Sequence, residues 1–599
     1  MFKRFSLLSI VFVLLIFVIS CAAQDGPVTN LPKINMSAWQ YNAEDDVYYQ
    51  LGIEYCETPA DENYENLAIF VPGAYFNGTD NSDGTWTCTV NTESTIGNFS
   101  AATAPIVIPV NTPGYSAMAP LSEYSNVTTY TNEGFVYVHA GCRGRNHGAP
   151  AGVTDLKAAV RYIRYTADLL PGNTESIFTF GMSGGGAQSA LMGATGDSEL
   201  YTPYLEAIGA VKGVSDTIFG SMCWCPITNL DSADEAYEWM MGTTRRGLSD
   251  EEQSISDQMA AAFASYINQA GFMDPDGNLL ALEASTEGIY HAGSYYGYII
   301  KVIEHSLNNF ITDTTFPYDA SSSQGGGHGM MGGGMRPDGN FGEGIGRGGQ
   351  RPEGMADGQM PDFGAFPGPQ QGEGETNYEA IDDITRNQTS SGLVLTGTYE
   401  TIEEYFDAMN ANGEWVSYDP QTRSATVYNL TGFVNAFKTA SKNLGAFDQI
   451  DGGQGENTLF GYGDGKGAHF DTTLTGILAS LGSEYAEAYA NDLQRTDALG
   501  NTVETRLNMY TPLYYLLETE EGYETANVAK HWRIRTGIAQ SDTSLTTEVD
   551  LALALEQYEG VESVDFETIW AAGHTQAERS GDSDSNFIVW VKSVLGIRF

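Results

Sequence analysis

The chain has 599 residues and carries 28 Lys and Arg against 77 Asp and Glu, a formal net charge of −49 at pH 7. An acidic excess of this size repels phosphates, so it argues against nucleic acid as a partner and disfavours polyanionic substrates. The length exceeds that of one typical domain.

The N-terminus carries the signals of an exported protein. Lys3 and Arg4 precede an almost unbroken apolar run over residues 5–19, which is the pattern of a signal peptide. The run ends in the letters VISC, which resemble a bacterial lipobox and make Cys21 the expected lipidated first residue of the mature chain. An uncleaved membrane anchor is the alternative. We therefore expect an extracytoplasmic protein of the bacterial cell envelope that meets the membrane only through its lipid anchor.

Residues 22–230 alternate between strand-like and helix-like patterns. Short apolar runs predict strands at 67–71, 134–139, 177–180 and 207–214, and a helix is expected at 155–170. Alternation of this kind implies a mostly parallel sheet with helices on both faces. The predicted fold class is α/β.

Helical patterns dominate after residue 230, for example at 250–270 and 294–310, and strand patterns return at 532–535 and 564–570. We divide the mature chain into a first core part (22–230), an insertion (231–530) and a last core part (531–599). Within the insertion, residues 319–376 are rich in Gly, Pro and Met without periodicity, which predicts a disordered loop. Its His and Met residues are too irregularly spaced to indicate a soft-metal site.

Five cysteines remain once Cys21 is set aside. Cys223 and Cys225 form a lone C-x-C that lacks the partners of a zinc site. Buried free thiols are expected, and a single disulfide between Cys56 and Cys88 is the alternative for an exported protein.

The stretch IFTFGMSGGGAQSALMG at 177–193 is the most informative in the chain. A strand runs into G-x-S-x-G and a helix follows at once, which is the context that makes this motif meaningful. The motif predicts an α/β-hydrolase with Ser183 as nucleophile, and an insertion at 231–530 would form a lid over it. The alternative is a Gly-rich turn without chemistry.

A serine nucleophile needs a base and an acid that orients the base, and in α/β-hydrolases they follow the serine as acid and then histidine. His574 comes after the last expected strand and is our general base; His139, His469 and His531 are weaker alternatives. Asp542 is the only carboxylate in the loop after 532–535 and is our acid. A helix N-cap is the alternative role for Asp542.

An oxyanion hole needs two backbone N–H groups. Gly184, which follows the nucleophile, supplies the first. We expect the second from the loop after the strand 67–71, at Ala74 or Tyr75.

Several motifs together resemble the bacterial tannases and their relatives among the α/β-hydrolase esterases. They are GRNHGAP (144–150), GVTDLK (152–157), LPGN (170–173), FGMSGGGAQS (180–189), CPITNLD (225–231) with AYEW (236–239), and HWRIR (531–535). The resemblance covers most of the chain outside 1–35 and 319–376. It implies hydrolysis of gallic acid esters by a Ser–Asp–His triad under a lid, a chemistry that needs no metal or cofactor.

In the resembled family, the loop after the strand carries two acids two residues apart, the first in the triad and the second at the galloyl hydroxyls. This chain has Gln540 and then Asp542. By strict position Asp542 matches the second acid, whereas counting back from His574 it fits the first. We assign Asp542 to the triad because glutamine cannot stabilise an imidazolium by charge. A weakened galloyl contact would follow.

Lys442 and Glu456 look like the family's lysine and glutamate that bind phenolic hydroxyls; ordinary exposed lid charges are the alternative. The leading hypothesis is a lipid-anchored esterase for small aromatic esters, gallate or related phenolics, acting through an acyl-enzyme. The alternatives are an esterase for feruloyl, sugar or xenobiotic esters, and a surface binding protein whose catalysis is impaired by Gln540. A peptidase is possible on fold alone.

Overall fold

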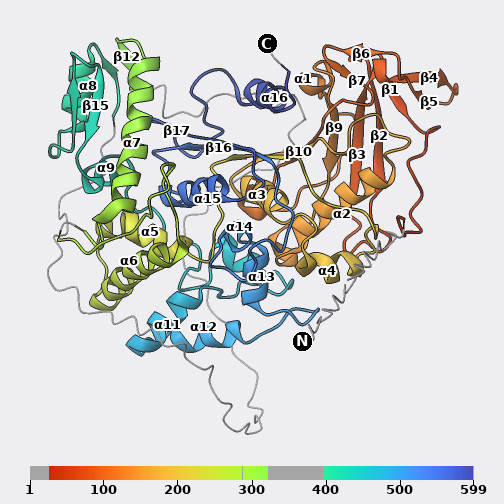
Figure 1. Cartoon of the computed structure of the whole chain (residues 1–599). Helices are drawn as coiled ribbons and strands as arrows, with labels where there is room; N and C mark the ends of the chain where they lie inside the picture. Colours follow the sequence, from red (N-terminus) through yellow and green to blue (C-terminus); the bar gives the residue numbers. More distant parts are fainter. Residues whose placement is uncertain (1–25, 287, 321–394, 598–599) are drawn as a thin grey trace, which may run out of the picture.

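The computed structural model describes residues 26–286, 288–320 and 395–597. At its centre lies a nine-stranded sheet in the order β1-β2-β3-β9-β8-β10-β11-β16-β17 (Figure 1). The strands are β1 (Gln40–Asn42), β2 (Val47–Glu54), β3 (Asn66–Pro72), β8 (Ile106–Val110), β9 (Val136–Ala140), β10 (Ile177–Met182), β11 (Gly220–Trp224), β16 (His531–Gly537) and β17 (Ser563–Ile569).

The sheet is parallel from β9 to β17, whereas β1, β2, β3 and β9 pair antiparallel. Helices cover both faces (Figure 1). The core helices are α1 (Thr128–Thr131), α2 (Ala151–Tyr165), α3 (Gly184–Ala194), α4 (Thr202–Ala207), α15 (Leu545–Gln557) and α16 (Ser583–Val594). This architecture confirms the predicted α/β-hydrolase fold.

Two helices fix the central strand β10 from opposite sides. Phe587 of α16 packs on Phe180 with ring centroids 4.4 Å apart, and Trp590 packs on Phe178 at 5.7 Å. Burial of each such ring contributes about 1.5–3 kcal/mol. On the other face lies α3, every residue of which is buried. The strand that ends at the predicted nucleophile is therefore held rigidly.

Two small hairpins lie beside the antiparallel end of the sheet. They are β4 (Phe76–Asp80) with β5 (Trp86–Val90), and β6 (Thr95–Ile96) with β7 (Phe99–Ser100).

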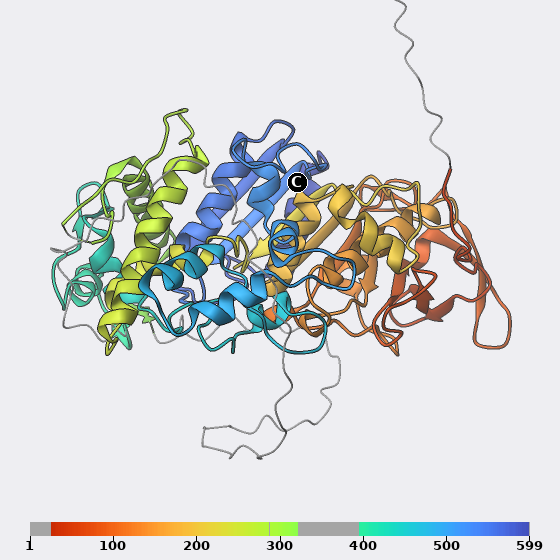
Figure 2. The ribbon, with the colours of Figure 1, turned by 90° about the horizontal axis from the view of Figure 1, so that it is seen from below.

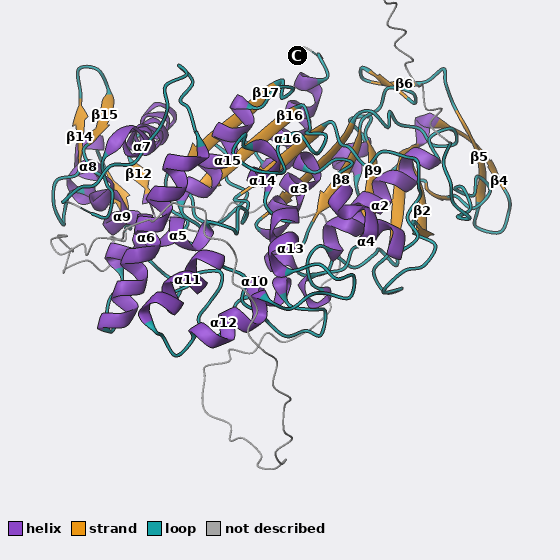
Figure 3. Cartoon of the chain, turned by 60° about the horizontal axis from the view of Figure 1, so that its bottom comes forward, coloured by secondary structure: helices purple, strands orange, loops and turns teal. Residues whose placement is uncertain are grey.

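The insertion between β11 and β16 is mainly helical. It contains α5 (Ala233–Met241), α6 (Asp250–Ala270), α7 (Gly293–Asp313), α8 (Ile402–Met409), α9 (Leu430–Phe437), α10 (Gly455–Phe460), α11 (Thr472–Leu481), α12 (Ala486–Leu493), α13 (Val503–Met509) and α14 (Pro512–Leu516). Two short strand pairs, β12 (Tyr318–Asp319) with β13 (Thr398–Tyr399) and β14 (Val416–Asp419) with β15 (Ser424–Val427), lie with α7 and α8 at one end of the molecule (Figure 3). Seen from below, the insertion runs from that end, in green, to its light-blue helices at the centre (Figure 2).

The end of the insertion packs directly on the core. The phenol oxygen of Tyr510, between α13 and α14, accepts a hydrogen bond from Gln188 of α3 at 3.3 Å. Tyr201 of the core donates to the backbone oxygen of Met509 at 2.6 Å. Residues 503–516 therefore form one packed unit with the helix that follows Ser183.

The helix predicted at 250–270 is confirmed as α6, which begins at a capping box of Ser249 and Glu252 and ends at Gly271 in the left-handed conformation. The strand predicted at 207–214 is wrong. Gly209 and Gly213 adopt φ of +66° and +70° there and turn the chain, so the next strand of the sheet is β11.

The five described cysteines are buried and free, so Cys56 and Cys88 form no disulfide. The predicted signal peptide with Cys21, and all but the first two residues of 319–376, lie outside the described residues. Within the described ranges, no helix has the length and apolar character needed to cross a bilayer.

Candidate active site

Ser183 occupies a sharp turn between β10 and α3. Its φ of 60° and ψ of −124° are a strained conformation for a residue with a side chain. The turn is possible because Gly184 and Gly185 follow the serine: a Cβ at Gly184 would lie 2.5 Å from the backbone nitrogen of Tyr115. The backbone N–H of Ser183 donates to the oxygen of Trp224 at 3.0 Å, which ties the turn to β11. Ser183 is only partly buried and so remains accessible.

The backbone N–H groups at the start of α3 lie beside this turn, as expected for Gly184. The prediction for Ala74 and Tyr75 is wrong. Because β3 runs antiparallel to β9, the end of β3 lies at the edge of the sheet where β9 begins. Tyr75 accordingly donates from its hydroxyl to the backbone oxygen of Gly134, just before β9, at 3.0 Å. Ser183 follows β10, which ends at the opposite edge.

The loop that reaches the nucleophile turn instead follows β8, the direct neighbour of β10. The backbone nitrogen of Gly114 in this loop lies 3.2 Å from the position that a Cβ of Gly184 would occupy. Arg145 donates from Nη1 to the backbone oxygen of Gly114 at 2.6 Å and so fixes the loop from outside. The backbone nitrogen of Gly114 therefore lies close to the start of α3.

His574 lies in the loop after β17, at the same edge as Ser183. The thiol of Cys225, one residue after Trp224, donates to the backbone oxygen of Thr575 at 3.2 Å and fastens this loop next to the nucleophile turn. The His574 side chain is 20% exposed. Burial lowers its pKa, and the charges of Lys442 and Lys438 act in the same direction against that of Asp542. A neutral imidazole, the form that can accept a proton, is thereby favoured at pH 7.

Asp542 is the carboxylate that faces His574. Its Oδ2 lies 3.7 Å from Nδ1 of His574, longer than a hydrogen bond. In the part of the chain that the structure describes, Nδ1 has no hydrogen-bond partner although it is buried. The cap of α15 is Ser544, so Asp542 is not the helix N-cap. The two side chains are thus paired in a loose arrangement that a small movement of the loop would close.

Gln540 stands where the resembled family has its triad acid, but its side chain has a different role here. Its Oε1 accepts from the backbone N–H groups of Asp542 and Thr543 at 3.0 and 3.1 Å. Its Nε2 donates to Oε1 of Glu548 at 3.1 Å and to the hydroxyl of Thr543. The side chain is 2% exposed. Gln540 therefore closes the turn that carries Asp542, a role that its sequence position does not indicate.

The insertion brings Lys442 and Glu456 to two sides of this region. Lys442 lies close enough to His574 for its charge to lower the pKa of the histidine, and its Nζ lies 3.8 Å from the ring centroid of Phe447. Glu456, in the first turn of α10, is 5% exposed, and its charge raises the pKa of Tyr115 in the loop after β8. Lys442 therefore lies near His574, and Glu456 lies near the loop after β8.

A buried hub of hydrogen bonds, not expected from the sequence, holds the segment between these two residues. Asp234 of α5 accepts from the backbone N–H groups of Phe447 and Asp448 at 2.7 and 2.9 Å. The carboxylate of Asp448 in turn accepts from the side chains of Asn457 and His469, each at 2.7 Å. The sequence indicates this hub only weakly, because a single aspartate in a helical region has many possible roles.

The alternative histidines do not join Ser183. His469 belongs to the hub, and His139 bonds to the backbone oxygen of Ala119 at 2.8 Å. His531 lies at the start of β16, at the edge of the sheet opposite to Ser183, and bonds to Ser563.

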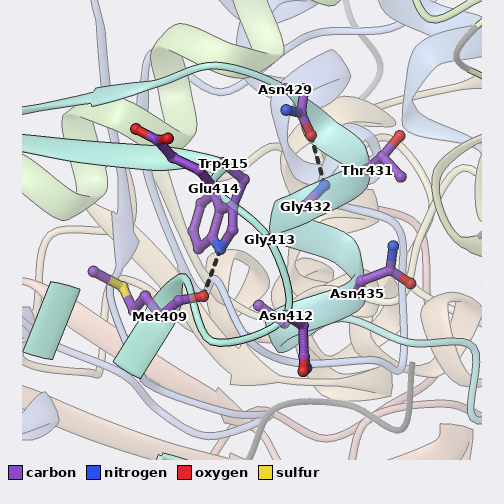
Figure 4. A pocket seen from close by; sticks show the side chains of 10 residues that line it. Met409, Asn412, Gly413, Glu414, Trp415, Asn429, Thr431, Gly432 and Asn435 are labelled. Carbon is purple, nitrogen blue, oxygen red and sulfur yellow. Dashed lines mark hydrogen bonds between the residues drawn. The ribbon is translucent and has the colours of Figure 1, made fainter. Parts of the chain in front are cut away.

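Two hollows lie in the insertion. One, of about 180 Å³, lies between the end of α8 and α9 beside Trp415, whose indole N–H donates to Met409 (Figure 4). None of Ser183, Asp542 and His574 lines it. The other, of about 700 Å³, has Lys442 in its wall and extends along the polar side of α6. None of Ser183, Asp542 and His574 lines the second hollow either, so Lys442 is the one predicted site residue in its wall.

Comparison with known proteins agrees with this fold. Residues 98–264 match the BD-FAE family model, and no curated protein has a matching sequence. The tannase of Fusobacterium nucleatum is 23% identical with a TM-score of 0.62, over 92% of this chain and 95% of that chain. The native tannin acyl hydrolase of Lactobacillus plantarum is 26% identical with a TM-score of 0.60, over 92% and 94%. A tannin acyl hydrolase in complex with ethyl gallate matches equally well, at 26% identity and a TM-score of 0.60.

The nine-stranded sheet, the turn at Ser183 and these similarities define the chain as a carboxylic ester hydrolase with the α/β-hydrolase fold. Within that class its similarity to the tannases extends through the insertion as well as the core, since 92% of the chain is covered. It is an esterase that is similar to the tannases.

Proposed function

We propose that this esterase hydrolyses small phenolic esters, gallates above all, with Ser183, His574 and Asp542 as a catalytic triad. The observation that carries the proposal is the position of the His574–Asp542 pair at the same sheet edge as the strained Ser183 turn. The ethyl gallate bound to a similar tannin acyl hydrolase supports the choice of acyl group.

In the proposed reaction, Nε2 of His574 takes the proton of the Ser183 hydroxyl while Oγ attacks the ester carbon. The carbonyl oxygen becomes an oxyanion and accepts hydrogen bonds from the N–H groups of Gly184 and Gly114. When the tetrahedral intermediate collapses, the alcohol leaves with the proton from His574 and the acyl group stays on Ser183. Water, activated by the same histidine, then releases the acid.

Asp542 stabilises the imidazolium that forms at each step. In this structure its Oδ2 lies 3.7 Å from Nδ1 of His574. Catalytic hydrogen bonds are often long without substrate and shorten when it binds.

The insertion supplies groups suited to a phenolic acyl ring. The ammonium of Lys442 and the carboxylate of Glu456 can each hydrogen-bond ring hydroxyls, and the segment between them closes over the ring. An ester whose ring lacks hydroxyls would leave the buried carboxylate of Glu456 without a partner, which costs about 1–3 kcal/mol. The 700 Å³ hollow beside Lys442 gives space for a larger ester.

A substrate panel tests the proposal. We expect faster hydrolysis of methyl gallate than of methyl ferulate or a short-chain nitrophenyl ester, and no hydrolysis by Ser183→Ala. The matched control is Ser189→Ala in the same helix, a buried serine bonded to Thr179 and Ser221. If only the nitrophenyl ester is cleaved, the phenolic site is refuted. If no ester is cleaved, a binding protein on this scaffold becomes the better account, as the loose His574–Asp542 contact would allow.

We also propose that the mature protein is anchored to the outer side of the cytoplasmic membrane through a lipid on Cys21. The support is the sequence of residues 1–21. Metabolic labelling with a radioactive fatty acid should mark the wild type but not Cys21→Ala, and equal labelling of both would contradict the anchor.

A further inference from the structure

A lysine of the insertion reaches into the loop that carries Asp542. Lys438 ends α9 and is 0% exposed. Its Nζ donates a hydrogen bond to the backbone oxygen of Gln540. Lysine is almost never fully buried unless its charge is paired, so the environment of this ammonium needs an explanation.

The partner charge is Glu548, in the first turn of α15 and also 0% exposed. Its Oε1 accepts from the hydroxyls of Thr536 and Thr543 at 3.2 and 3.0 Å, besides the amide of Gln540. Each of the two charges favours ionisation of the other. Gln540 lies between them, with its backbone oxygen on Lys438 and its side-chain amide on Glu548.

Three other ionisable groups feel the ammonium of Lys438. They are the thiol of Cys225 after β11, the carboxylate of Asp542 after β16 and the imidazole of His574 after β17. The lysine therefore lies close to the predicted acid and base. It belongs to the insertion, whereas they belong to the core.

We propose that Lys438 is a positioning residue: paired with Glu548 across Gln540, its ammonium holds the Asp542 loop in place, so that the acid faces His574 only while α9 is docked on the core. The inference rests on the proposed function. Lys438 touches neither substrate nor reacting atoms and acts through Gln540 and Asp542.

The arrangement makes activity depend on pH in a specific way. Burial lowers the pKa of Lys438 to about 8 and raises that of Glu548 to about 7. Above pH 8 the amine loses its charge, Asp542 and Glu548 lose their counter-ion, and kcat should fall. In the acid direction, the ammonium lowers the pKa of His574 and so keeps the base neutral to lower pH.

The test is the pH profile of a nitrophenyl ester hydrolysis by full-length variants. In Lys438→Met we expect kcat to fall about tenfold with KM little changed, as for loss of a charged hydrogen bond. The alkaline limb should disappear, and the acid limb should move up by about 0.5 pH unit. In Glu548→Gln, which keeps the shape but removes the counter-charge, the alkaline limb should move down by about 1 pH unit.

The matched control is Lys157→Met. Lys157 is equally buried and pairs with Asp216 at 2.8 Å, but it lies on α2 away from the acid loop. It should lower the melting temperature without moving either limb.

If Lys438→Met and Glu548→Gln also change only the melting temperature, Lys438 is a structural residue and the inference is overturned. Should Lys438→Met fail to fold, the signed shift in Glu548→Gln decides alone. A wild type that cleaves no ester would refute the proposed function instead, so the two failures are distinguishable.

Discussion

The contact between Asp542 and His574 allows the effect of one substitution to be worked out. Two unit charges 3.7 Å apart interact by about 4.5 kcal/mol at an effective dielectric constant of about 20, a value typical near a protein surface. The Asp542 side chain is 46% exposed, however, so water screens it further. A dielectric constant of about 40 halves the interaction to about 2 kcal/mol.

Asp542→Asn should therefore lower kcat about 30-fold, since about 1.4 kcal/mol corresponds to a factor of ten. This is much less than the roughly 10⁴-fold loss seen when the acid of a tight serine-protease triad is replaced by its amide. Stopped assays of a nitrophenyl ester at pH 7.5 measure it, and Asp464→Asn, at an aspartate of the insertion whose side chain is 47% exposed, is the control. A loss of less than about threefold would refute the idea that Asp542 stabilises the imidazolium, because even the screened charge is worth more than that.

Three further substitutions test the surroundings of the site. Gln540→Asp restores the residue type of the resembled family, but it removes two hydrogen-bond donors and places a carboxylate beside Glu548. We therefore expect thermal melting to show a loss of about 1–3 kcal/mol in stability, with no gain in kcat. A faster enzyme would contradict the turn-closing role. Asp448→Asn weakens the buried hub, which holds the segment between Lys442 and Glu456. KM for methyl gallate should therefore rise at least about fivefold, while kcat on the nitrophenyl ester is nearly unchanged. An equal loss of activity on both esters would point to misfolding. Lys442→Met removes a charge that lowers the pKa of His574, so the acid limb of the kcat/KM profile should move to higher pH. An acid limb that stays in place would mean that the ammonium is screened from the histidine.

The sharp turn at Ser183 is predictable from the sequence, whereas the order of the strands in the sheet is not. The turn at Ser183 leaves a Gly-rich pattern, and His574 follows the last strand that the sequence predicts. The loop after β8 was missed because Pro109 interrupts a short apolar run, and proline is rare inside a sheet. The structure tolerates it since β9 pairs only with Ile106 and Val107 of that strand.

The second oxyanion donor was placed wrongly for the same reason. Without β8, the second donor is expected in the loop after the strand 67–71, which the structure places at the opposite edge of the sheet. Strand order in a sheet depends on long-range pairing that no local pattern encodes. The function of Gln540 was equally hidden, because its bonds to Asp542, Thr543 and Glu548 exist only when the turn is formed.

The packing of residues 503–516 on α3 has a consequence for engineering and for folding. Residues 231–530 are continuous in sequence, yet Tyr510 and Lys438 complete contacts of the core at Gln188 and Gln540. A shortened gene that joins β11 directly to β16 would lose these contacts and expose the buried helix behind Ser183. We therefore expect the insertion and the sheet to unfold in a single cooperative transition. The chain should tolerate changes in its outer helices, but it should not fold if it is divided between the insertion and the core.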